Sequence, residues 1–251
     1  MIRVAAVAPC TSNADDLAFA SLADAVRATE GMPDSRVVGG HMVGLLLTAF
    51  PIPGLSARRT TDADAGLSTA IAARGDVTGR LLELGYLRVD GSRFERDGRT
   101  VDLLVEVAGS KFRPRDFEDG QLDGSPGLDL ALATDPIEID TTVVYTDGRD
   151  ERFVVRVPTV EWATVIKAYA AESRLAAKDI ADLHHLLEIR HLHGRDSIGG
   201  WRLDDEPAMG RRLDAARVLR LVKAGDSRLH AAGVRPARFI ELVREHVAPL
   251  D

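Results

Sequence analysis

The sequence is poor in cysteine, lysine and aromatic residues, and it lacks any long apolar run. Only one of its 251 residues is a cysteine, which excludes an internal disulfide framework. No apolar run approaches the ~20 residues that span a bilayer, so we expect no membrane segment. The apolar core between Met1 and Cys10 is shorter than the ~7–15 residues of a signal peptide, and acidic Asp15 and Asp16 follow it closely. We therefore expect no export signal and a cytoplasmic protein.

A strong excess of positive charge is also absent. The formal net charge is -7; residues 1–157 carry 17 Lys and Arg against 25 Asp and Glu, and residues 158–251 carry 15 against 14. A dedicated nucleic-acid-binding domain has a concentrated basic face, so these charges disfavour that class. An enzyme that contacts RNA briefly through a local patch stays compatible with them. The content of 45% hydrophobic and 28% charged residues is typical of a globular protein.

Helical and strand patterns alternate in the first part of the chain. Apolar spacing and capping residues predict helices at about 14–30, 41–50 and 76–84. Alternating runs, several of them joined by Asp-Gly turns, predict strands at 36–38, 62–67, 86–89, 92–96, 100–107, 141–145 and 152–157. Residues 109–126 are rich in Gly, Pro and Asp and predict a mobile loop.

The pattern becomes purely helical after Pro158. Helices are predicted at about 160–172, 176–190, 211–224 and 236–247. We therefore expect an α/β (α+β) fold: a domain at residues 1–157 with a mixed β-sheet flanked by helices, then a helical C-terminal domain at residues 158–251. The stretch after Gly199 contains no motif that indicates a function.

The most informative motif is a glycine pair followed by two alternating aspartates. Gly39 and Gly40 precede a predicted helix, where glycine lets a phosphate approach the backbone N–H groups of the helix N-terminus. Asp62 and Asp64 lie on a predicted strand, so their side chains point to the same face. Two converging carboxylates repel each other unless a cation lies between them, and oxygen-only ligands suit Mg²⁺. The motif predicts a site for a metal-bound nucleotide.

A third acid, Asp102, completes this site. Its predicted strand follows two tight hairpins and can lie beside the strand of Asp62 and Asp64. Three carboxylates can hold two Mg²⁺ ions ~3.5–4 Å apart, which act on the attacking and leaving oxygens of phosphoryl transfer. The simpler alternative is that each aspartate caps a turn and faces solvent. The combination of three acids with the glycine pair favours the metal site.

These residues resemble the signature of the DNA polymerase beta-like nucleotidyltransferase superfamily. The similarity lies in Gly39-Gly40-His41-Met42-Val43, Arg59-Thr60-Thr61-Asp62-Ala63-Asp64 and Val101-Asp102-Leu103-Leu104. The second half of the chain resembles the AbiEii-type toxins of toxin–antitoxin pairs through Lys167, Arg174 and Lys178-Asp179-Ile180-Ala181-Asp182-Leu183. His41 departs from the Ser or Thr of many members, and the gap from Gly40 to Asp62 is longer than usual.

The resemblance implies a Mg²⁺-dependent nucleotidyltransferase that moves a nucleoside monophosphate from an NTP to an acceptor hydroxyl. It implies that Asp62, Asp64 and Asp102 bind two Mg²⁺ ions and that Asp102 helps to deprotonate the acceptor. It also implies an RNA acceptor, the 3′ end of a tRNA, and a cognate antitoxin protein as partner. Two alternatives stay open: a small-molecule acceptor of the aminoglycoside type, and a catalytically inactive nucleotidyltransferase-like binding module.

Further residues are candidates for catalysis or nucleotide binding. Lys167 is one of only four lysines against 28 arginines, and its compact charge suits a triphosphate. The alternative for Lys167 is a place at the edge of an amphipathic helix. By resemblance, Asp179 lies close to the active site and orients Lys167, although a surface pairing explains Lys178 and Asp179 equally well. The nucleotide-binding candidates are Gly39, Gly40, His41, Arg59, Thr61 and Lys178.

Two features of the helical part favour structural roles. His184, Glu188 and His191 share one helix face, which allows a metal site, but no cysteine or further cluster of acids supports zinc there. A basic helix could bind RNA phosphates, but nearby acids favour a plain solvated face for Arg211, Arg212, Arg217, Arg220 and Lys223. The residues expected in the core are Trp162, Ile166 and Tyr169.

Overall fold

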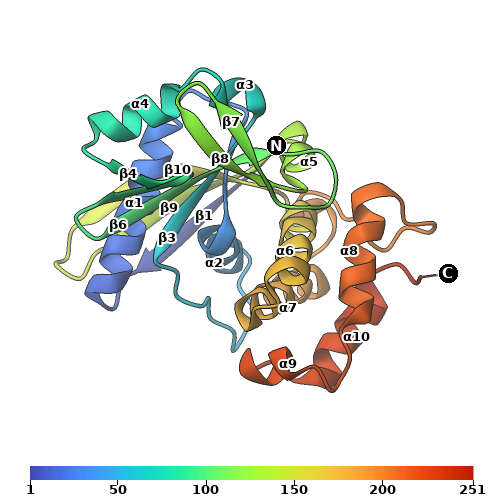
Figure 1. The fold of residues 1–251 in the computed structure, drawn as a ribbon. Helices are drawn as coiled ribbons and strands as arrows, with labels where there is room; N and C mark the ends of the chain where they lie inside the picture. Colours follow the sequence, from blue (N-terminus) through green and yellow to red (C-terminus); the bar gives the residue numbers. More distant parts are fainter. Residues whose placement is uncertain (251) are drawn as a thin grey trace.

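The computed structural model describes residues 1–250, and within this range the strands form two sheets (Figure 1). The smaller sheet has the strand order β1-β9-β10 and is built from β1 (Ile2–Pro9), β9 (Ile137–Val144) and β10 (Asp150–Val157). The strands of the larger sheet are β2 (Ser35–Val38), β3 (Asp62–Leu67), β4 (Leu87–Asp90), β5 (Arg93–Arg96), β6 (Arg99–Glu106), β7 (Arg113–Phe117) and β8 (Gly120–Ser125).

Both sheets mix parallel and antiparallel pairs. In the larger sheet the main order is β2-β3-β6-β5-β4, with β3 parallel to β6 and the other pairs of this path antiparallel. Beyond the end of β5, the edge of β6 pairs with β8 in parallel, and β7 pairs with β8. In the smaller sheet β1 and β9 are parallel, and β9 and β10 are antiparallel. The expected α/β class, with mixed sheets flanked by helices, is confirmed.

Helices cover the sheets and make up most of the chain after β10 (Figure 1). They are α1 (Asn13–Ala28), α2 (Gly39–Ala49), α3 (Thr69–Ala72), α4 (Asp76–Glu83), α5 (Leu128–Ala133), α6 (Val160–Arg174), α7 (Ala177–Leu192), the 3₁₀-helix η1 (Asp196–Ile198), α8 (Gly210–Leu221), α9 (Ser227–Ala231) and α10 (Pro236–His246). Within residues 1–250, none of them is long and apolar enough to cross a membrane.

The larger sheet has one apolar face, which is covered by α1. Successive side chains of a strand point to opposite faces, and Ala63, Ala65, Val101 and Leu103 are almost fully buried on the face that meets α1. The residues between them therefore point to the other face of β3 and β6. This alternation alone sends the three aspartates away from α1 and toward the helices after β10.

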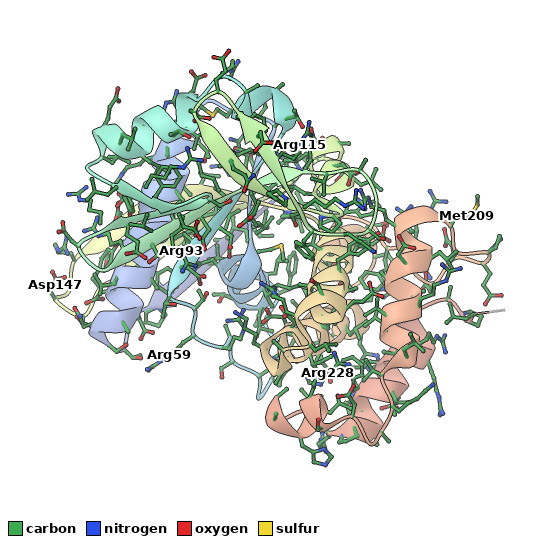
Figure 2. The ribbon with its side chains drawn as sticks, in the orientation of Figure 1. Arg59, Arg93, Arg115, Asp147, Met209 and Arg228 are labelled. Carbon is green, nitrogen blue, oxygen red and sulfur yellow. The ribbon has the colours of Figure 1, made fainter. Side chains whose placement is uncertain are left out.

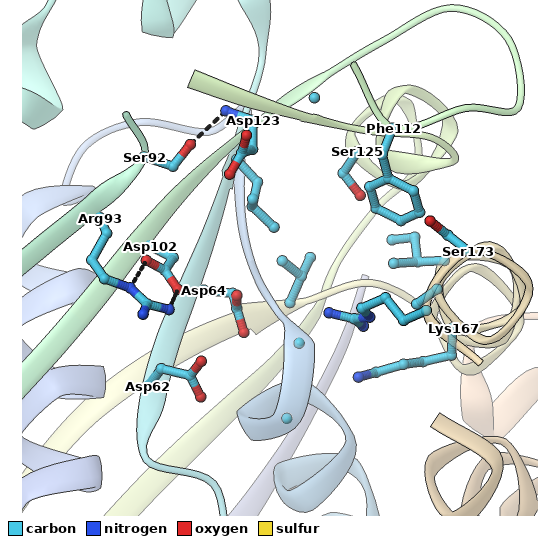
Figure 3. Close-up of a pocket in the computed structure, with 18 of the residues that line it drawn as sticks. Asp62, Asp64, Ser92, Arg93, Asp102, Phe112, Asp123, Ser125, Lys167 and Ser173 are labelled. Carbon is cyan, nitrogen blue, oxygen red and sulfur yellow. Dashed lines mark hydrogen bonds and ion pairs between the residues drawn. The ribbon is translucent and has the colours of Figure 1, made fainter. Parts of the chain in front are cut away.

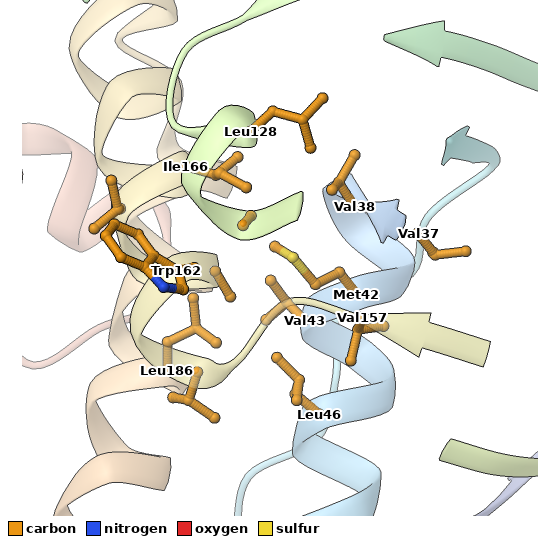
Figure 4. Packing of buried hydrophobic residues seen from close by; sticks show 14 of the residues in the cluster. Val37, Val38, Met42, Val43, Leu46, Leu128, Val157, Trp162, Ile166 and Leu186 are labelled. Carbon is orange, nitrogen blue, oxygen red and sulfur yellow. The ribbon is translucent and has the colours of Figure 1, made fainter. Parts of the chain in front are cut away.

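The segment from β2 into α2 joins the sheet to the helical part of the molecule. Figure 4 shows Met42 and Leu46 of α2 packed near Val157, Trp162 and Leu186, all of which are buried. One apolar core thus extends from the sheets into α6 and α7. The expected core positions of Trp162, Ile166 and Tyr169 are confirmed, since each is at most 6% exposed. The division into two domains at Pro158 stays a prediction.

The prediction of a mobile loop at residues 109–126 is wrong. The segment forms the hairpin of β7 and β8, and β8 adds to the edge of β6. At Gly124 the hairpin leaves no room for a side chain, because a Cβ atom there would lie 2.2 Å from the carbonyl oxygen of Arg113. The glycine that favours a loop in the sequence is required in the hairpin by this close approach of the two strands.

Candidate active site

Three carboxylates converge on the face of the larger sheet that α1 leaves uncovered. Asp62 and Asp64 are two residues apart on β3, and the strand register pairs Asp64 directly with Asp102 of β6. One oxygen from each of the three carboxylates lies within 4.8 Å of the other two. Figure 3 shows all three pointing into the same cavity. The expected meeting of the three acids is therefore present in the structure.

The glycine pair at the start of α2 has no room for side chains, because Gly39 lies against Asp64 and Gly40 lies against Thr60. Gly39 adopts a left-handed φ of 65° at the start of α2, and a Cβ atom there would lie 1.7 Å from Oδ2 of Asp64. A Cβ atom at Gly40 would lie 2.5 Å from Oγ1 of Thr60. Without side chains, the two glycines let the N-terminus of α2 approach the acids closely. Both also line the cavity, so the backbone N–H groups there are accessible to a ligand.

Asp102 is held by an arginine of the neighbouring strand. Arg93 of β5 lies directly opposite Asp102, and its Nε and Nη2 atoms donate hydrogen bonds of 3.0 and 2.9 Å to the two carboxylate oxygens. The side-chain hydrogen bonds and charge of Asp102 raise the pKa of Arg93 above its ordinary value. This two-point pair neutralises Asp102 and fixes its rotamer, whereas none of the described basic side chains forms a salt bridge with Asp62 or Asp64.

The carboxyl group of Asp64 has a strongly raised pKa. Desolvation deep in the cavity raises its pKa to about 7, and the negative charges of Asp62 and Asp102 add to this effect against the opposing charge of Lys167. A bound cation would favour the ionised form of the same group. Asp62 and Asp64 thus lie together without a salt bridge to any of the described basic side chains, whereas Asp102 is paired with Arg93.

The opposite wall of the cavity consists of α6 and α7 and carries cations. Lys167 of α6 is buried, and its Nζ atom lies 2.7 Å from Oδ2 of Asp182 and 3.8 Å from Oδ1 of Asp179. Arg174, whose side chain is half exposed, donates a hydrogen bond of 2.9 Å to Asp179. Asp179 is therefore near Lys167 as expected, but Asp182 makes the shorter contact, and neither acid is on the helix surface.

A second arginine, absent from the predicted site, completes this network. The guanidinium of Arg58 donates hydrogen bonds of 2.7 and 2.9 Å to the two oxygens of Asp182. Burial acts to lower the pKa of Arg58, but the hydrogen bonds and charge of Asp182 outweigh it, so the pKa is raised. Arg58, Lys167 and Arg174 thus share two buried carboxylates, which leaves one net positive charge facing the acids of β3 and β6.

The two walls enclose a cavity of about 640 Å³. Lys178 of α7, Arg113 at the start of β7 and Phe112 before it also line the cavity. A volume in the range of ~300–1,000 Å³ is typical of sites for small molecules and cofactors. Further polar groups of the lining are Asp90, Ser92, Asp123, Ser125 and Ser173.

Three predicted nucleotide-binding residues do not lie in this cavity. The ring of His41 is buried between α2 and α1, where Nε2 lies 3.1 Å from the carbonyl oxygen of Ala18, and burial lowers its pKa to about 4. Arg59 is exposed on the outer surface and lies 3.5 Å from Asp15 (Figure 2). Thr61 is also exposed and is not part of the cavity lining.

The correction for Arg59 and Thr61 follows from strand geometry. In an extended chain, residues of the same parity as Asp62 and Asp64 face the same side. Arg58 and Thr60 have that parity and line the cavity, whereas Arg59 and Thr61 do not. The same rule that selected the two aspartates could have selected Arg58 and Thr60.

The predicted solvated basic face is wrong for three of its five residues, whereas Arg217 and Lys223 are exposed as expected. Arg211 lies 2.9 Å from a carboxylate oxygen of Asp129, and Arg212 lies 2.7 Å from Glu161 and over the ring of Trp162. Arg220 donates to carbonyl oxygens near the C-terminus of α10. These contacts attach α8 to the rest of the protein and leave Arg211, Arg212 and Arg220 poorly available for RNA phosphates.

Comparison with known proteins gives little beyond this geometry. No protein-family model and no curated protein sequence matches the chain. Among solved structures, the chain is similar to the antibiotic-resistance factor ANT(2″)-Ia, with 14% sequence identity and a TM-score of 0.42 over 71% of this chain and 90% of that chain. A likeness of this size carries no argument about activity, so the function is argued from the cavity itself.

Proposed function

We propose that the protein is a nucleotidyltransferase that moves a nucleoside monophosphate from an NTP to an acceptor hydroxyl in a Mg²⁺-dependent reaction. The observation that supports it is the convergence of Asp62, Asp64 and Asp102 on one point of a cavity whose opposite wall is cationic. A triphosphate with its metal ion needs carboxylates that bind the metal and, nearby, cationic side chains that bind the phosphates.

The donor set fits Mg²⁺. All three ligands offer carboxylate oxygen, which this hard cation prefers. Burial and the neighbouring carboxylates raise the pKa of Asp64, and a bound cation would offset both. Asp62, Asp64 and Asp102 would hold the metal. When bound, Mg²⁺ supplies charge neutralisation at the phosphate oxygens and at the reacting oxygens. The Arg93–Asp102 pair competes with the metal, so Arg93 must release at least one oxygen of Asp102.

The residues of the chain then have distinct tasks. Lys167, Arg174 and Lys178 bind the phosphates from the helix wall, and the backbone N–H groups at Gly39 and Gly40 face them from α2. The acceptor hydroxyl oxygen attacks the α-phosphorus, the bond from this phosphorus to the bridging oxygen breaks, and pyrophosphate leaves. The hydroxyl proton passes to the carboxylate of Asp102. Asp179 and Asp182 position Lys167 without touching the reacting atoms.

Two classes of acceptor are consistent with this cavity. The sequence resemblance to AbiEii-type toxins supports an RNA 3′ end, such as that of a tRNA, and adds a cognate antitoxin that suppresses the transfer. A different observation supports a small cationic molecule with hydroxyl groups: Asp90 and Asp123 line the same cavity beside the three metal-binding acids. Their negative charge attracts a cationic acceptor and repels an RNA backbone.

Incubation of the purified protein with each of the four labelled NTPs, Mg²⁺ and either total RNA or an aminoglycoside tests the proposal. Label on RNA supports the first acceptor, and label on the aminoglycoside supports the second. The Asp64→Asn variant is the matched control and should transfer no label in either case. If calorimetry detects binding of Mg-NTP but no acceptor takes up label, the protein is a binding module. Absence of both binding and transfer contradicts the nucleotide site itself.

A further inference from the structure

A second cluster of metal-binding side chains lies at the opposite end of α7 from the cavity. Lys178, at the start of α7, lines the cavity, and His191 lies near the end of the same helix, roughly 20 Å further along it. There it meets Glu245 and His246, the last two residues of α10. The side chains of these three residues converge so that one nitrogen or oxygen from each lies within 4.8 Å of the other two.

The distances between these atoms suit a single ion. Nδ1 of His191 lies 3.1 Å from Nε2 of His246 and 3.1 Å from Oε2 of Glu245, and the other oxygen of Glu245 lies 3.6 Å from Nε2 of His246. Two ligands at ~2.0–2.1 Å from one tetrahedral ion are separated by a little more than 3 Å. The two ring nitrogens share one proton in their hydrogen bond, and a metal ion can take the place of that proton.

The surroundings hold the ligands in place and favour a cation. Both α7 and α10 end at the cluster, so the partial negative charges of two helix C-termini point toward it. The ring of His246 is buried, and Nε1 of Trp201 donates a hydrogen bond of 2.9 Å to its carbonyl oxygen. The side chains of His191 and Glu245 are 34% and 50% exposed, which leaves a path for an ion and room for water as a fourth ligand.

The nearby arginine charge is largely neutralised by other acids. Arg238 of α10 donates hydrogen bonds of 2.8 and 2.7 Å to the two oxygens of Glu188 and another of 2.9 Å to Glu241. Glu188 is thus paired with Arg238, and within residues 1–250 the ligand atoms of His184, Glu188 and His191 do not converge on one point. His191 instead turns toward α10.

We propose that His191, Glu245 and His246 form a site for a borderline divalent transition metal such as Zn²⁺, which clips the end of α10 to the end of α7. Two imidazoles and one carboxylate are a ligand set that Zn²⁺ accepts and that Mg²⁺ disfavours. The site is separate from the three aspartates in place and in donor chemistry, so it does not depend on the proposed transfer reaction.

Competition between the untagged protein and a chromogenic chelator for Zn²⁺ tests this site. Excess Mg²⁺ is present throughout, so that Asp62, Asp64 and Asp102 are occupied by the ion that they prefer. We expect one equivalent of Zn²⁺ per chain and a higher Tm with Zn²⁺, because an ion that binds only the folded state stabilises it. Loss of an outer partner of a metal ligand typically lowers affinity ~10–100-fold, so His191→Ala and Glu245→Gln should weaken binding by at least that factor.

Matched controls separate this site from incidental binding. Glu172→Gln changes an exposed glutamate of α6, and His230→Ala changes an exposed histidine of α9. Both controls should keep the wild-type affinity for Zn²⁺ and the Zn²⁺-dependent rise in Tm. The proposal is overturned if no tight equivalent of Zn²⁺ is found, or if His191→Ala and Glu245→Gln bind Zn²⁺ as tightly as the two controls. A wild-type Tm without Zn²⁺ shows that these variants still fold.

Discussion

The two walls of the cavity differ in whether their charged side chains are paired. The wall formed by β3 and β6 is called the sheet wall here, and the wall formed by α6 and α7 is called the helix wall. On the sheet wall, Asp62 and Asp64 lie side by side with like charge and no cationic partner among the described side chains. On the helix wall, Lys167 and Arg174 are paired with buried acids at distances of 2.7 to 2.9 Å. Uncompensated charge destabilises the fold and is retained where a ligand completes it, whereas compensated charge is part of the architecture. Under the proposed function, the sheet wall would hold the metal, and the paired helix wall would form a rigid frame for the phosphates.

The largest effect is expected from the sheet wall. Asp64→Asn removes a proposed metal ligand and should lower the rate of nucleotide transfer by roughly 10²–10³-fold, the range found when one main electrostatic contact of a transition state is lost. Because it also removes a repelling charge, the Tm should stay equal to that of the wild type or rise. Label transfer and thermal unfolding measure the two effects. The exposed Asp150→Asn is the control and should change neither. A Tm that falls together with the activity would mean that the acids are structural.

Substitutions in the helix wall should lower the stability of the fold. Asp182→Asn leaves Lys167 and Arg58 without their shared carboxylate, and breaking a buried pair in this way costs ~3–5 kcal/mol. Denaturant unfolding should show a lower midpoint at an unchanged m-value. Adding Lys167→Met should restore part of the stability, since it removes one of the unpaired charges. If Asp182→Asn unfolds like the wild type, the ion network does not hold this wall together.

The sheet wall could be predicted from the sequence and most of the helix wall could not. The positions of Asp62 and Asp64 follow from the period of two in a strand, and Asp102 follows from the hairpins that lead to its strand. The pairing of Arg58 with Asp182 joins residues that are 124 positions apart, and no local pattern indicates it. The surface pairing that would explain Asp179 is also not found, because the packing of α6 against α7 buries Asp179 completely.

The missed strands have a similar cause. β1 is an apolar segment whose short length resembles a leader sequence, and its partner β9 is more than 130 residues away. β7 and β8 have a composition that favours turns, and they are strands because β8 pairs with the edge of β6. Strand formation depends on such partners more than on propensity. The convergence of the three acids can be predicted from the sequence because it depends on local patterns, namely strand alternation and tight hairpin turns.

Acidic pH should destabilise the protein through buried histidines outside both walls. Burial lowers the pKa of His41 and that of His184 to about 4, against an ordinary value of 6.5. Between pH 6.5 and pH 4, the unfolded chain therefore binds protons at these histidines that the folded protein does not bind. The free energy of unfolding falls as the pH drops through this range, by up to ~1.4 kcal/mol per pH unit for each histidine. Urea unfolding at a series of pH values measures this slope. His41→Gln should flatten it, and an unchanged slope would show that His41 does not contribute.

The smallest effect is expected at Asp102, the acid of the sheet wall that is paired with an arginine. Arg93→Gln frees both oxygens of Asp102, so the affinity for Mg²⁺ should rise by roughly tenfold, equivalent to about 1.4 kcal/mol. Isothermal titration with Mg²⁺ in the absence of NTP measures it. Arg152→Gln, on the surface of β10 and outside the cavity, is the control and should leave the affinity unchanged. A fall in Mg²⁺ affinity for Arg93→Gln would mean that Arg93 holds Asp102 in its ligating position, and the sheet wall would then share the pre-organised character of the helix wall.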